Sequence, residues 1–166
     1  MIEYRTLLGA DATQEEVDTF VELVRSGGAV DEKYVQMGAV RPGAHISFAE
    51  VRGRPVGVAA LKIPSDNYRF GLQGAAKAGY SLLNSEYPYE LGYVSVLPEH
   101  SGKGIGKALV TEVIRLADGN GIFATTSNPT MKDGLLPSFA FEPAGRNWTN
   151  SSGDILGLFV RKSEKK

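Results

Sequence analysis

The sequence predicts a mixed α/β protein. Strand-like runs rich in β-branched residues alternate with amphipathic stretches of helical period, in the order β-α-α-β-β-loop-β-α-β-α-β-β. One strand-to-helix junction carries three alternate glycines, which form either a plain glycine-rich turn or an anion-binding site, and the strand before them and the amphipathic helix after them favour the binding site. At 166 residues the length is that of one domain, 1–166, large enough for a self-sufficient core.

Strands are expected where β-branched and apolar residues run together between turn residues. They cover residues 2–8, 46–51, 55–61, 90–97, 122–127, 141–149 and 155–160. Arg52-Gly53-Arg54 is expected to join the second and third of these strands as a hairpin, and residues 150–153 are expected to join the last two.

Helices are expected where apolar residues recur at helical period. The first begins after Thr13, which has the spacing of a capping box with Glu16, and it ends at Gly27-Gly28. The others are expected over residues 31–40, 72–83, 105–118 and 129–136. Residues 65–89 are the least regular part, and a loop of that length is either functional or poorly ordered.

Charge and hydropathy patterning argue against several classes of protein. The formal net charge is −1, so nothing in the total favours binding to nucleic acid or to an anionic membrane. The first residues show no export signal, and no segment approaches the roughly twenty apolar residues of a membrane span. We therefore expect a cytoplasmic protein.

The chain has no cysteine and two histidines, which excludes disulfides, a cysteinyl acyl-enzyme and the ligand spacing of a zinc site. No Gly-x-Ser-x-Gly sequence occurs, so a serine acyl-enzyme is unsupported as well. No metal is expected. If the chain handles thioesters, direct transfer of the acyl group to the acceptor is the simplest route.

The most informative stretch joins the strand over 90–97 to the helix that starts at Ile105. Its loop carries Gly102, Gly104 and Gly106. A glycine-rich turn of this kind leaves several backbone N–H groups unpaired at the positive end of a helix dipole. The guest that suits such a site is a phosphate or diphosphate.

Spacing separates the phosphate-binding motifs that compete for this loop. A Walker A loop would need Gly at Ser101 and Ser or Thr at Ala108, so both of its tests fail. A dinucleotide fingerprint needs two residues between its second and third glycines, whereas the glycines here alternate strictly.

The remaining pattern resembles motif A of the GNAT superfamily, the acyl-CoA-dependent N-acetyltransferases. The matching residues run from Ser101 to Gly106, with Ser101 where the family usually has Arg or Gln. That departure leaves the backbone donors intact and costs one side-chain contact at most. Asn128 after a strand, and Ala140-Phe141 before a terminal hairpin, match later parts of the family pattern.

The resemblance implies a mixed, mostly antiparallel sheet of about six to seven strands flanked by helices, with its fourth strand splayed from a neighbour at a bulge. It also implies acetyl-CoA as co-substrate, its diphosphate on the turn and its pantetheine on the splayed strand. Lys103 and Lys107 either add charge beside the diphosphate or only solvate the helix start. The residues expected to bind the coenzyme are Val94, Ser95, Val96, Ser101, Gly102, Lys103, Gly104, Ile105, Gly106, Lys107 and Asn128.

Glu90 is the candidate general base, because several family members carry a catalytic glutamate on this strand. An amine acceptor arrives as an ammonium ion and must lose a proton before it attacks the thioester. The alternatives are a solvent-exposed glutamate at a strand edge, and one that positions the acceptor without moving a proton.

A general acid is harder to assign. Many relatives have a tyrosine on the penultimate helix that protonates the leaving thiolate, and this chain has Leu136 there. Because a thiol pKa near 8.5 makes such help optional, direct departure of the thiolate, Ser138 and a tyrosine from residues 65–89 all remain open.

We therefore expect an N-acetyltransferase that moves acetyl from acetyl-CoA to a primary amine of a small molecule or peptide. One alternative is a catalytically silent CoA-binding sensor. The other is a protein-interaction module with residues 65–89 as its contact surface. The acceptor stays open, and since exposed strand edges in this fold often pair, so does a homodimer.

Overall fold

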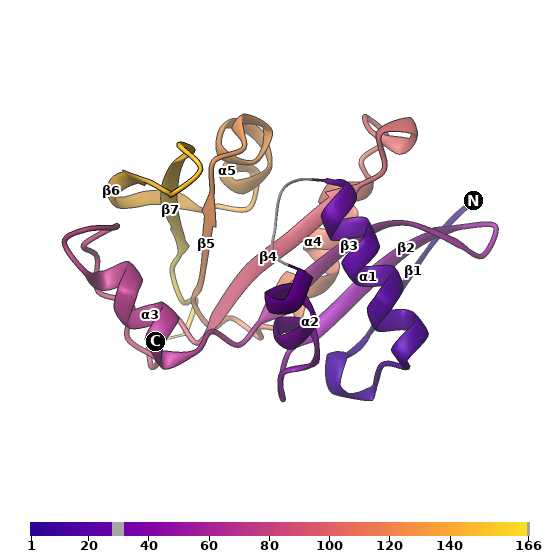
Figure 1. Ribbon diagram of the computed structural model, residues 1–166, viewed down its shortest axis with the longest axis horizontal. Helices are drawn as coiled ribbons and strands as arrows, with labels where there is room; N and C mark the ends of the chain where they lie inside the picture. The colour runs from indigo at the N-terminus through magenta and orange to yellow at the C-terminus, as the bar shows by residue number, and fades with distance from the viewer. Residues whose placement is uncertain (28–31, 166) are drawn as a thin grey trace. The chain divides into compact units, whose positions relative to one another are not determined.

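The computed structural model describes residues 1–27 and 32–165 (Figure 1). Two compact units divide the chain, and each is built from two separate stretches of sequence. The first contains Met1–Ile63 and Leu91–Asp118, and the second contains Pro64–Glu90 and Gly119–Lys166. The strand β4, Tyr89–Val96, passes from one unit to the other. The single domain expected from length stays a prediction.

The first unit is built on antiparallel strands. These are β1 (Ile2–Leu8), β2 (His45–Val51), β3 (Arg54–Lys62) and the greater part of β4. Its helices are α1 (Gln14–Ser26), α2 (Glu32–Val40) and α4 (Ile105–Arg115), with the short turns η1 (Gly9–Asp11) and η2 (Pro98–His100). Strand β2 pairs antiparallel with both β1 and β3, as the predicted hairpin requires.

The β2–β3 hairpin closes through two residues with left-handed backbone. Arg52 has φ 52° and Gly53 has φ 76°, and Val51 pairs with Arg54 across the turn. Two central residues at positive φ give a turn whose twist matches that of the strands, which is why short hairpins prefer it.

Alternate residues of β3 face opposite sides of the first unit's strands. Val58 and Ala60 belong to a core with the apolar side of α1, whereas a Cβ at Gly57 would lie within 3.2 Å of Ile105 on α4. Since successive strand residues point to opposite faces, α1 and α4 cover opposite faces of the strands (Figure 1). Phe20 on α1 is fully buried at the centre of the first of these layers.

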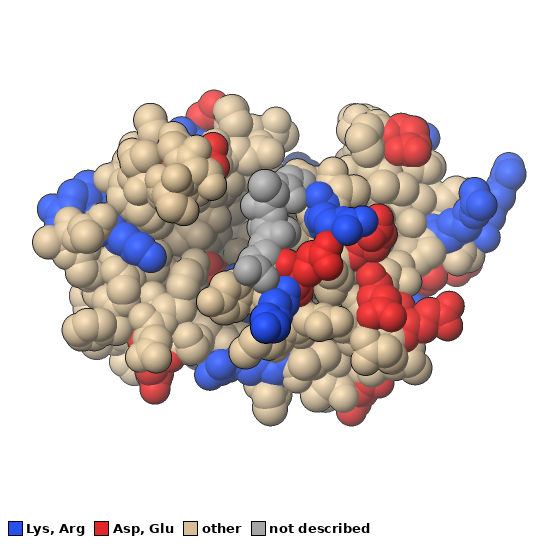
Figure 2. All heavy atoms as spheres, viewed as in Figure 1, with Lys and Arg blue, Asp and Glu red and all other residues tan. Residues whose placement is uncertain are grey.

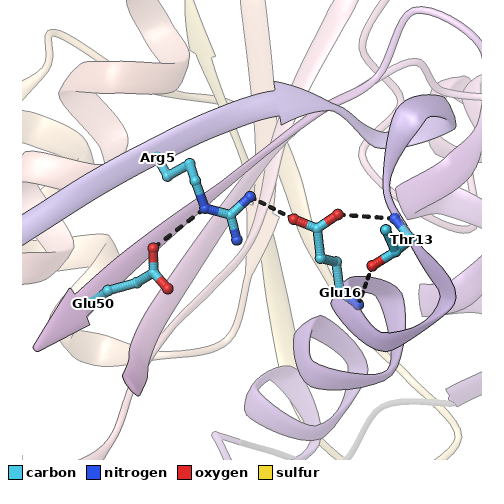
Figure 3. Close-up of polar contacts among 4 residues, drawn as sticks. All are labelled: Arg5, Thr13, Glu16 and Glu50. Carbon is cyan, nitrogen blue, oxygen red and sulfur yellow. Dashed lines mark hydrogen bonds and ion pairs between the residues drawn. The ribbon is translucent and has the colours of Figure 1, made fainter. Parts of the chain in front are cut away.

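A network of polar contacts fixes the start of α1 against the strands (Figure 3). The Thr13 Oγ accepts from the Glu16 N–H at 3.1 Å, and the Glu16 Oε1 accepts from the Thr13 N–H at 2.8 Å, so the predicted capping box is confirmed. Arg5 on β1 donates to Glu16 and, at 3.3 Å, to Glu50 on β2. Figure 2 shows that acidic side chains gather over α1.

The second unit contains the first residues of β4, which pair in parallel with β5. Its other elements are α3 (Asp66–Gln73), β5 (Ile122–Thr126), η3 (Met131–Leu135), α5 (Leu136–Ser138), β6 (Glu142–Thr149) and β7 (Ile155–Arg161). Strand β7 pairs antiparallel with β5 and with β6. Leu72, Leu82, Tyr87 and Phe123 form the buried core beside these strands.

The hydrogen-bonded strands follow the order β1-β2-β3-β4-β5-β7-β6, a seven-stranded sheet in which β4 and β5 form a parallel pair. The predicted class, a mixed and mostly antiparallel sheet flanked by helices, is therefore confirmed. The splay of β4 from a neighbour stays a prediction.

Several element boundaries differ from the prediction. The helix expected over 72–83 is wrong. The helix in this region, α3, begins earlier, where the Ser65 hydroxyl accepts from the Tyr68 N–H, and it ends at Gln73. The helix expected to reach 118 ends at Arg115. Gly28 and Asp31, where a helix end and a helix start were expected, lie outside the described residues.

Residues 1–27 and 32–165 contain neither a membrane-spanning helix nor a cluster of metal ligands. None of the helices there has the length and apolar content to cross a membrane. These residues also bring no three His, Asp or Glu side chains together as a metal site would.

The Glu16 contacts make part of the stability depend on pH. Hydrogen bonds from the Thr13 backbone and from Arg5 lower the pKa of Glu16 below its ordinary 4.5. The stabilisation is therefore complete above pH 4.5 and is lost as the pH falls through the folded-state pKa. Glu16→Gln should be less stable than the wild type at pH 7, and the gap should close in acid. Urea unfolding over this pH range measures it.

Glu15→Gln is the matched control, because Glu15 lies in the same helix turn and makes no side-chain hydrogen bond among the described residues. It should not reproduce the acid-dependent gap. A Glu16→Gln deficit that stays constant from neutral pH to acid contradicts the assignment.

Candidate functional site

Short backbone hydrogen bonds hold the junction between β4 and α4. The Leu97 N–H donates to the Val56 C=O of β3 at 2.8 Å, which fixes the end of β4. The Ser101 N–H and hydroxyl both donate to the Pro98 C=O, at 3.1 Å and 2.8 Å. Both Ser101 donors, its N–H and its hydroxyl, are thus used inside the turn, and the glycine-rich loop begins at the next residue.

The backbone N–H groups of residues 102–107, here called the amide cradle, have no hydrogen-bond acceptor among the described residues. The first helical bond of α4 is donated by the Ala108 N–H to the Gly104 C=O, at 3.1 Å. Gly104 supplies no side-chain cap, and the first turn of α4 contains no acidic residue. Unpaired donors at the positive end of a helix suit an anion.

The cradle depends on glycine for its shape. Gly102 has φ 76° and Gly104 has φ 78°, a conformation that other residues adopt only at a cost. A Cβ built at either position has no atom within 4 Å, so the space in front of both residues is open. Gly106 completes the cradle beside Val96, whose Cγ2 would lie 3.9 Å from its Cβ.

The side chains of the cradle divide by exposure. Lys103 and Lys107 are exposed and can add positive charge, whereas the Ile105 side chain is buried in the core. Ile105 can therefore offer a ligand only its backbone. Open space, unpaired N–H donors and nearby ammonium groups together fit the diphosphate of coenzyme A.

Within β4, Ser95 has a structural contact that the sequence did not reveal. Its hydroxyl is buried and donates to the Leu23 C=O at the end of α1, at 2.9 Å. The helix ends so close to the strand that a Cβ at Gly27 would lie 2.1 Å from the Ser95 Oγ. Only the backbone of Ser95 is left to bind pantetheine, and Val94 and Val96 beside it are half-buried.

Tyr93 interrupts the regular geometry of β4 one residue before Val94. Its φ is 54°, and its ring packs against two neighbours of the first unit. The Lys62 Nζ lies 4.2 Å from the ring centroid, and the Phe20 ring meets it edge-on at 6.0 Å. Sequence reasoning expected an irregular strand near Val94–Val96 and gave no signal for Tyr93.

In the second unit, Glu90 is 2% exposed, so it is not a solvent-exposed glutamate at a strand edge. The Tyr68 hydroxyl donates to the Glu90 Oε2 at 2.8 Å and lies 3.2 Å from the Thr125 Oγ1. Tyr68 comes from α3, within the irregular region from which a tyrosine was one open possibility for the acid. Thr125 on β5 was not anticipated.

Arg69, the residue after Tyr68, is a buried cation. It donates to the Leu82 C=O at 2.8 Å and to the Tyr87 C=O at 2.7 Å, and its guanidinium lies 5.5 Å from the centroid of the Phe123 ring. Burial lowers the pKa of Arg69, and the carboxylates of Asp66 and Glu90 act in the opposite direction. Arg69 therefore holds residues 82–87 in place and brings positive charge toward Glu90.

Asn128 has the geometry of a helix start. Its Oδ1 accepts from the Thr130 N–H at 2.8 Å and from the Met131 N–H at 3.3 Å, at the beginning of η3. The side chain is exposed. A contact with coenzyme stays a prediction, and the turn-starting role is the one that these hydrogen bonds support.

The position that holds a tyrosine in many relatives offers no acid. Leu136 is fully buried, and the nearby Ser138 hydroxyl donates to the Leu135 C=O at 2.6 Å. Leucine has no acidic proton to give, and the Ser138 hydroxyl proton is used in its hydrogen bond to Leu135.

The sequence matches the acetyltransferase (GNAT) family over residues 11–133, and the chain belongs to that family. Members are N-acetyltransferases that use acetyl-CoA as co-substrate, so the predicted enzyme class and co-substrate are confirmed. The matched range includes β4, the amide cradle, Glu90 and Asn128. A search of curated protein sequences found no match.

Solved structures agree with the fold. ElaA from Escherichia coli aligns with a TM-score of 0.70 at 14% identity, over 97% of this chain and 99% of that one. The ribosomal-protein-S18-alanine N-acetyltransferase from Escherichia coli gives 0.68 at 15%, over 100% and 96%. The yncA protein from Salmonella typhimurium, solved with its cofactor acetyl-CoA, gives 0.63 at 18%, over 100% and 96%. At these identities the similarity shows the fold alone.

The buried hydrogen bonds of Arg69 should make it essential for stability. Arg69→Met leaves two buried carbonyl groups without their donor, and each such group costs about 1–3 kcal/mol. We expect the free energy of unfolding to fall by about 2 kcal/mol or more in urea titration.

Arg146→Met is the matched control, because Arg146 is an exposed arginine that donates to one backbone carbonyl, that of Ala75 at 3.1 Å. It should change stability by about 0.5 kcal/mol or less. Equal losses of unfolding free energy in the two variants would show that the buried hydrogen bonds of Arg69 stabilise the fold no more than the exposed hydrogen bond of Arg146.

Proposed function

We propose that the chain transfers acetyl from acetyl-CoA to a primary amine by direct attack of the amine on the thioester. Family membership supports the reaction class and the co-substrate. The observation that carries the proposal is the amide cradle: its N–H groups have no acceptor within residues 1–27 and 32–165, and the space before Gly102 and Gly104 is open. Acetyl-CoA supplies the activated thioester when bound.

The cradle binds the diphosphate through backbone N–H groups and does not depend on the Arg or Gln that Ser101 replaces. Lys103 and Lys107 add attraction from the two ends of the loop. The backbone of Val94, Ser95 and Val96 binds the pantetheine arm, and the Ser95 hydroxyl contributes by anchoring the strand to α1. Asn128 is the least supported coenzyme contact, since its side-chain oxygen already accepts from the Thr130 and Met131 N–H groups.

Glu90 is the general base in this proposal. A primary amine is mostly protonated near neutral pH, and removing one proton frees the lone pair that attacks the thioester carbonyl. The new C–N bond forms and the C–S bond breaks, the nitrogen gives up its second proton to water so that a neutral amide results, and the coenzyme leaves as a thiolate. A thiol pKa near 8.5 makes that departure feasible without a dedicated acid, consistent with Leu136 in the usual tyrosine position.

The acceptor belongs to the class of small-molecule or peptide amines on which the family acts, and its identity within that class is open. A cytoplasmic location and a homodimer remain predictions from the sequence. An acceptor screen with detection of free thiol, using purified protein and acetyl-CoA, tests the function directly. Acetyl-CoA binding without amine-dependent thiol release in a wide screen would favour the silent sensor.

Gly104→Ala tests the cradle. Alanine at φ 78° costs about 1–2 kcal/mol of local strain, and its Cβ enters the space in front of the loop. We expect the Kd for acetyl-CoA to rise about tenfold or more in calorimetry.

Gly153→Ala is the matched control, because Gly153 has φ 86° and equally open surroundings on the turn between β6 and β7. It should suffer similar strain and leave the Kd unchanged. If Gly104→Ala binds acetyl-CoA as tightly as the wild type, the diphosphate does not use this loop.

Glu90→Gln tests the base. Glutamine keeps the shape and one hydrogen-bond acceptor but cannot take a proton, so kcat should fall by roughly a hundredfold. Calorimetry should give an unchanged Kd for acetyl-CoA. Unchanged turnover would remove Glu90 from the mechanism.

A further inference from the structure

The two edge strands of the sheet, β1 and β6, differ in how far their outer sides are blocked. Along β6, Pro143 has no N–H to offer, and the register with β7 shifts between Ala144 and Trp148. The Arg146 N–H of the same strand already donates to the Ala78 C=O at 2.9 Å. Proline, an irregular register and a covering segment are features by which proteins keep an edge strand from pairing with another chain.

Strand β1 has none of these features. Its seven residues pair with β2 in one continuous register and include no proline. Within the described part of the chain, the backbone of residues 2–7 makes hydrogen bonds with β2 alone. Because alternate residues of an antiparallel strand direct their N–H and C=O groups to opposite sides, the outer side of β1 presents donors and acceptors that a further strand can use.

The charged side chains of β1 share one face of the sheet. Arg5 donates to Glu50 through its Nε and to Glu16 through its Nη1 (Figure 3). Glu3, two residues earlier, lies on the same face and stands opposite Glu50 in the β1–β2 register. Among the described residues, Glu3 forms no ion pair and the Arg5 Nη2 has no acceptor. Glu3 thus faces a like charge without a cation of its own.

We propose that β1 pairs antiparallel with β1 of a second copy of this chain, about a two-fold axis at Tyr4. Such an axis sets one residue opposite itself, and residues equally spaced on either side of it opposite one another. With Tyr4 at the axis, Glu3 lies opposite Arg5 of the second copy, and symmetry repeats the pair. The Arg5 Nη2 donates to the Glu3 carboxylate, which gives Glu3 its counter-charge.

The neighbouring registers are disfavoured by charge. An axis at Arg5 sets two arginines directly opposite each other, and an axis at Glu3 does the same with two glutamates, which destabilises a strand pair. On the other face, the Tyr4 register brings together two Tyr4 side chains, each 37% exposed, and sets Ile2 opposite Thr6. Cross-strand aromatic pairs add to the stability of a sheet.

Disulfide trapping tests the register. The sequence contains no cysteine, so one introduced thiol per chain reports its own position without background. Tyr4→Cys sets two thiols opposite each other across the axis, at a separation that a disulfide spans. The full chain with this change should give a dimer of doubled mass on a non-reducing gel after mild oxidation, and reductant should reverse it.

Thr6→Cys is the matched control. Its two thiols stand four positions apart along the paired strands, roughly 14 Å, which is too far for a disulfide. Alone it should remain a monomer on the same gel, as should Ile2→Cys for the same reason. An equimolar mixture of Ile2→Cys and Thr6→Cys should cross-link, because the Tyr4 register sets these two positions opposite each other.

Glu3→Arg tests the charge pair without any cysteine. It sets positive side chains opposite each other at both symmetry-related positions, so the Kd of the dimer should rise about tenfold or more in sedimentation equilibrium. Glu142→Arg is the matched control, because Glu142 is an exposed glutamate on β6, the other edge strand. It changes the net charge equally and should leave the Kd of the dimer unchanged. Circular dichroism checks that every variant is folded.

Three results would overturn the dimer. The first is a wild type that sediments as a monomer at every concentration up to its solubility limit. The second is a failure of Tyr4→Cys to cross-link, or cross-linking of Thr6→Cys alone, which shows that any dimer uses another surface or register. The third is equal weakening by Glu3→Arg and Glu142→Arg. The inference is independent of the proposed function, so each of these results leaves the transferase assignment standing.

Discussion

Backbone N–H groups at the start of α4 that find no acceptor in the described part of the chain are the constraint on which the functional interpretation depends. Two longer helices meet the same requirement with side chains, since Thr13 caps α1 and Ser65 caps α3. Asn128 similarly accepts from the Thr130 and Met131 N–H groups where η3 begins. At α4 the N-cap is Gly104, which has no side chain to offer. Helix ends without partners are costly unless water or a ligand supplies them. The contrast within one chain indicates that α4 begins with its donors available for a ligand.

The cradle is positioned by contacts that are themselves independent of any ligand. Leu97 fixes the end of β4 on β3, and Ser101 closes the turn that follows. Ile105 is buried under the strands, so the first turn of α4 cannot rotate without disturbing the core. Preorganised donors bind an anion without the cost of ordering a loop, which is a general advantage of rigid sites.

Much of the fold could be predicted because it depends on local patterns. The capping box at Thr13, the hairpin at Arg52-Gly53 and all seven strands follow from periodicity and turn residues, with small errors at their ends. The helix α3 was misplaced because three glycines in residues 71–79 obscured its end, while the Ser65 cap that starts it is a weak signal. The cradle was also visible in sequence, since its glycines are neighbours along the chain.

The polar cluster of the second unit could not be predicted, because Tyr68, Glu90 and Thr125 share no local pattern. Arg69 is similarly hidden, as an arginine next to an exposed Phe70 gives no sign that it is buried. Contacts between distant positions depend on strand register, here the parallel pairing of Glu90 with Phe123. Sequence periodicity identifies the strands but leaves this register open.

The surroundings of Glu90 are difficult to explain by stability alone. Leu91 and Phe123, next to it along the strand and across the β4–β5 pair, are both buried and apolar. A well-packed apolar residue is often as stable as a buried charge, whereas a buried carboxylate needs hydrogen bonds and a counter-charge to be tolerated. The chain supplies both, through the Tyr68 hydroxyl and the nearby Arg69 guanidinium. Proton chemistry, as proposed for Glu90, would account for a buried carboxylate at this position, whereas packing alone does not.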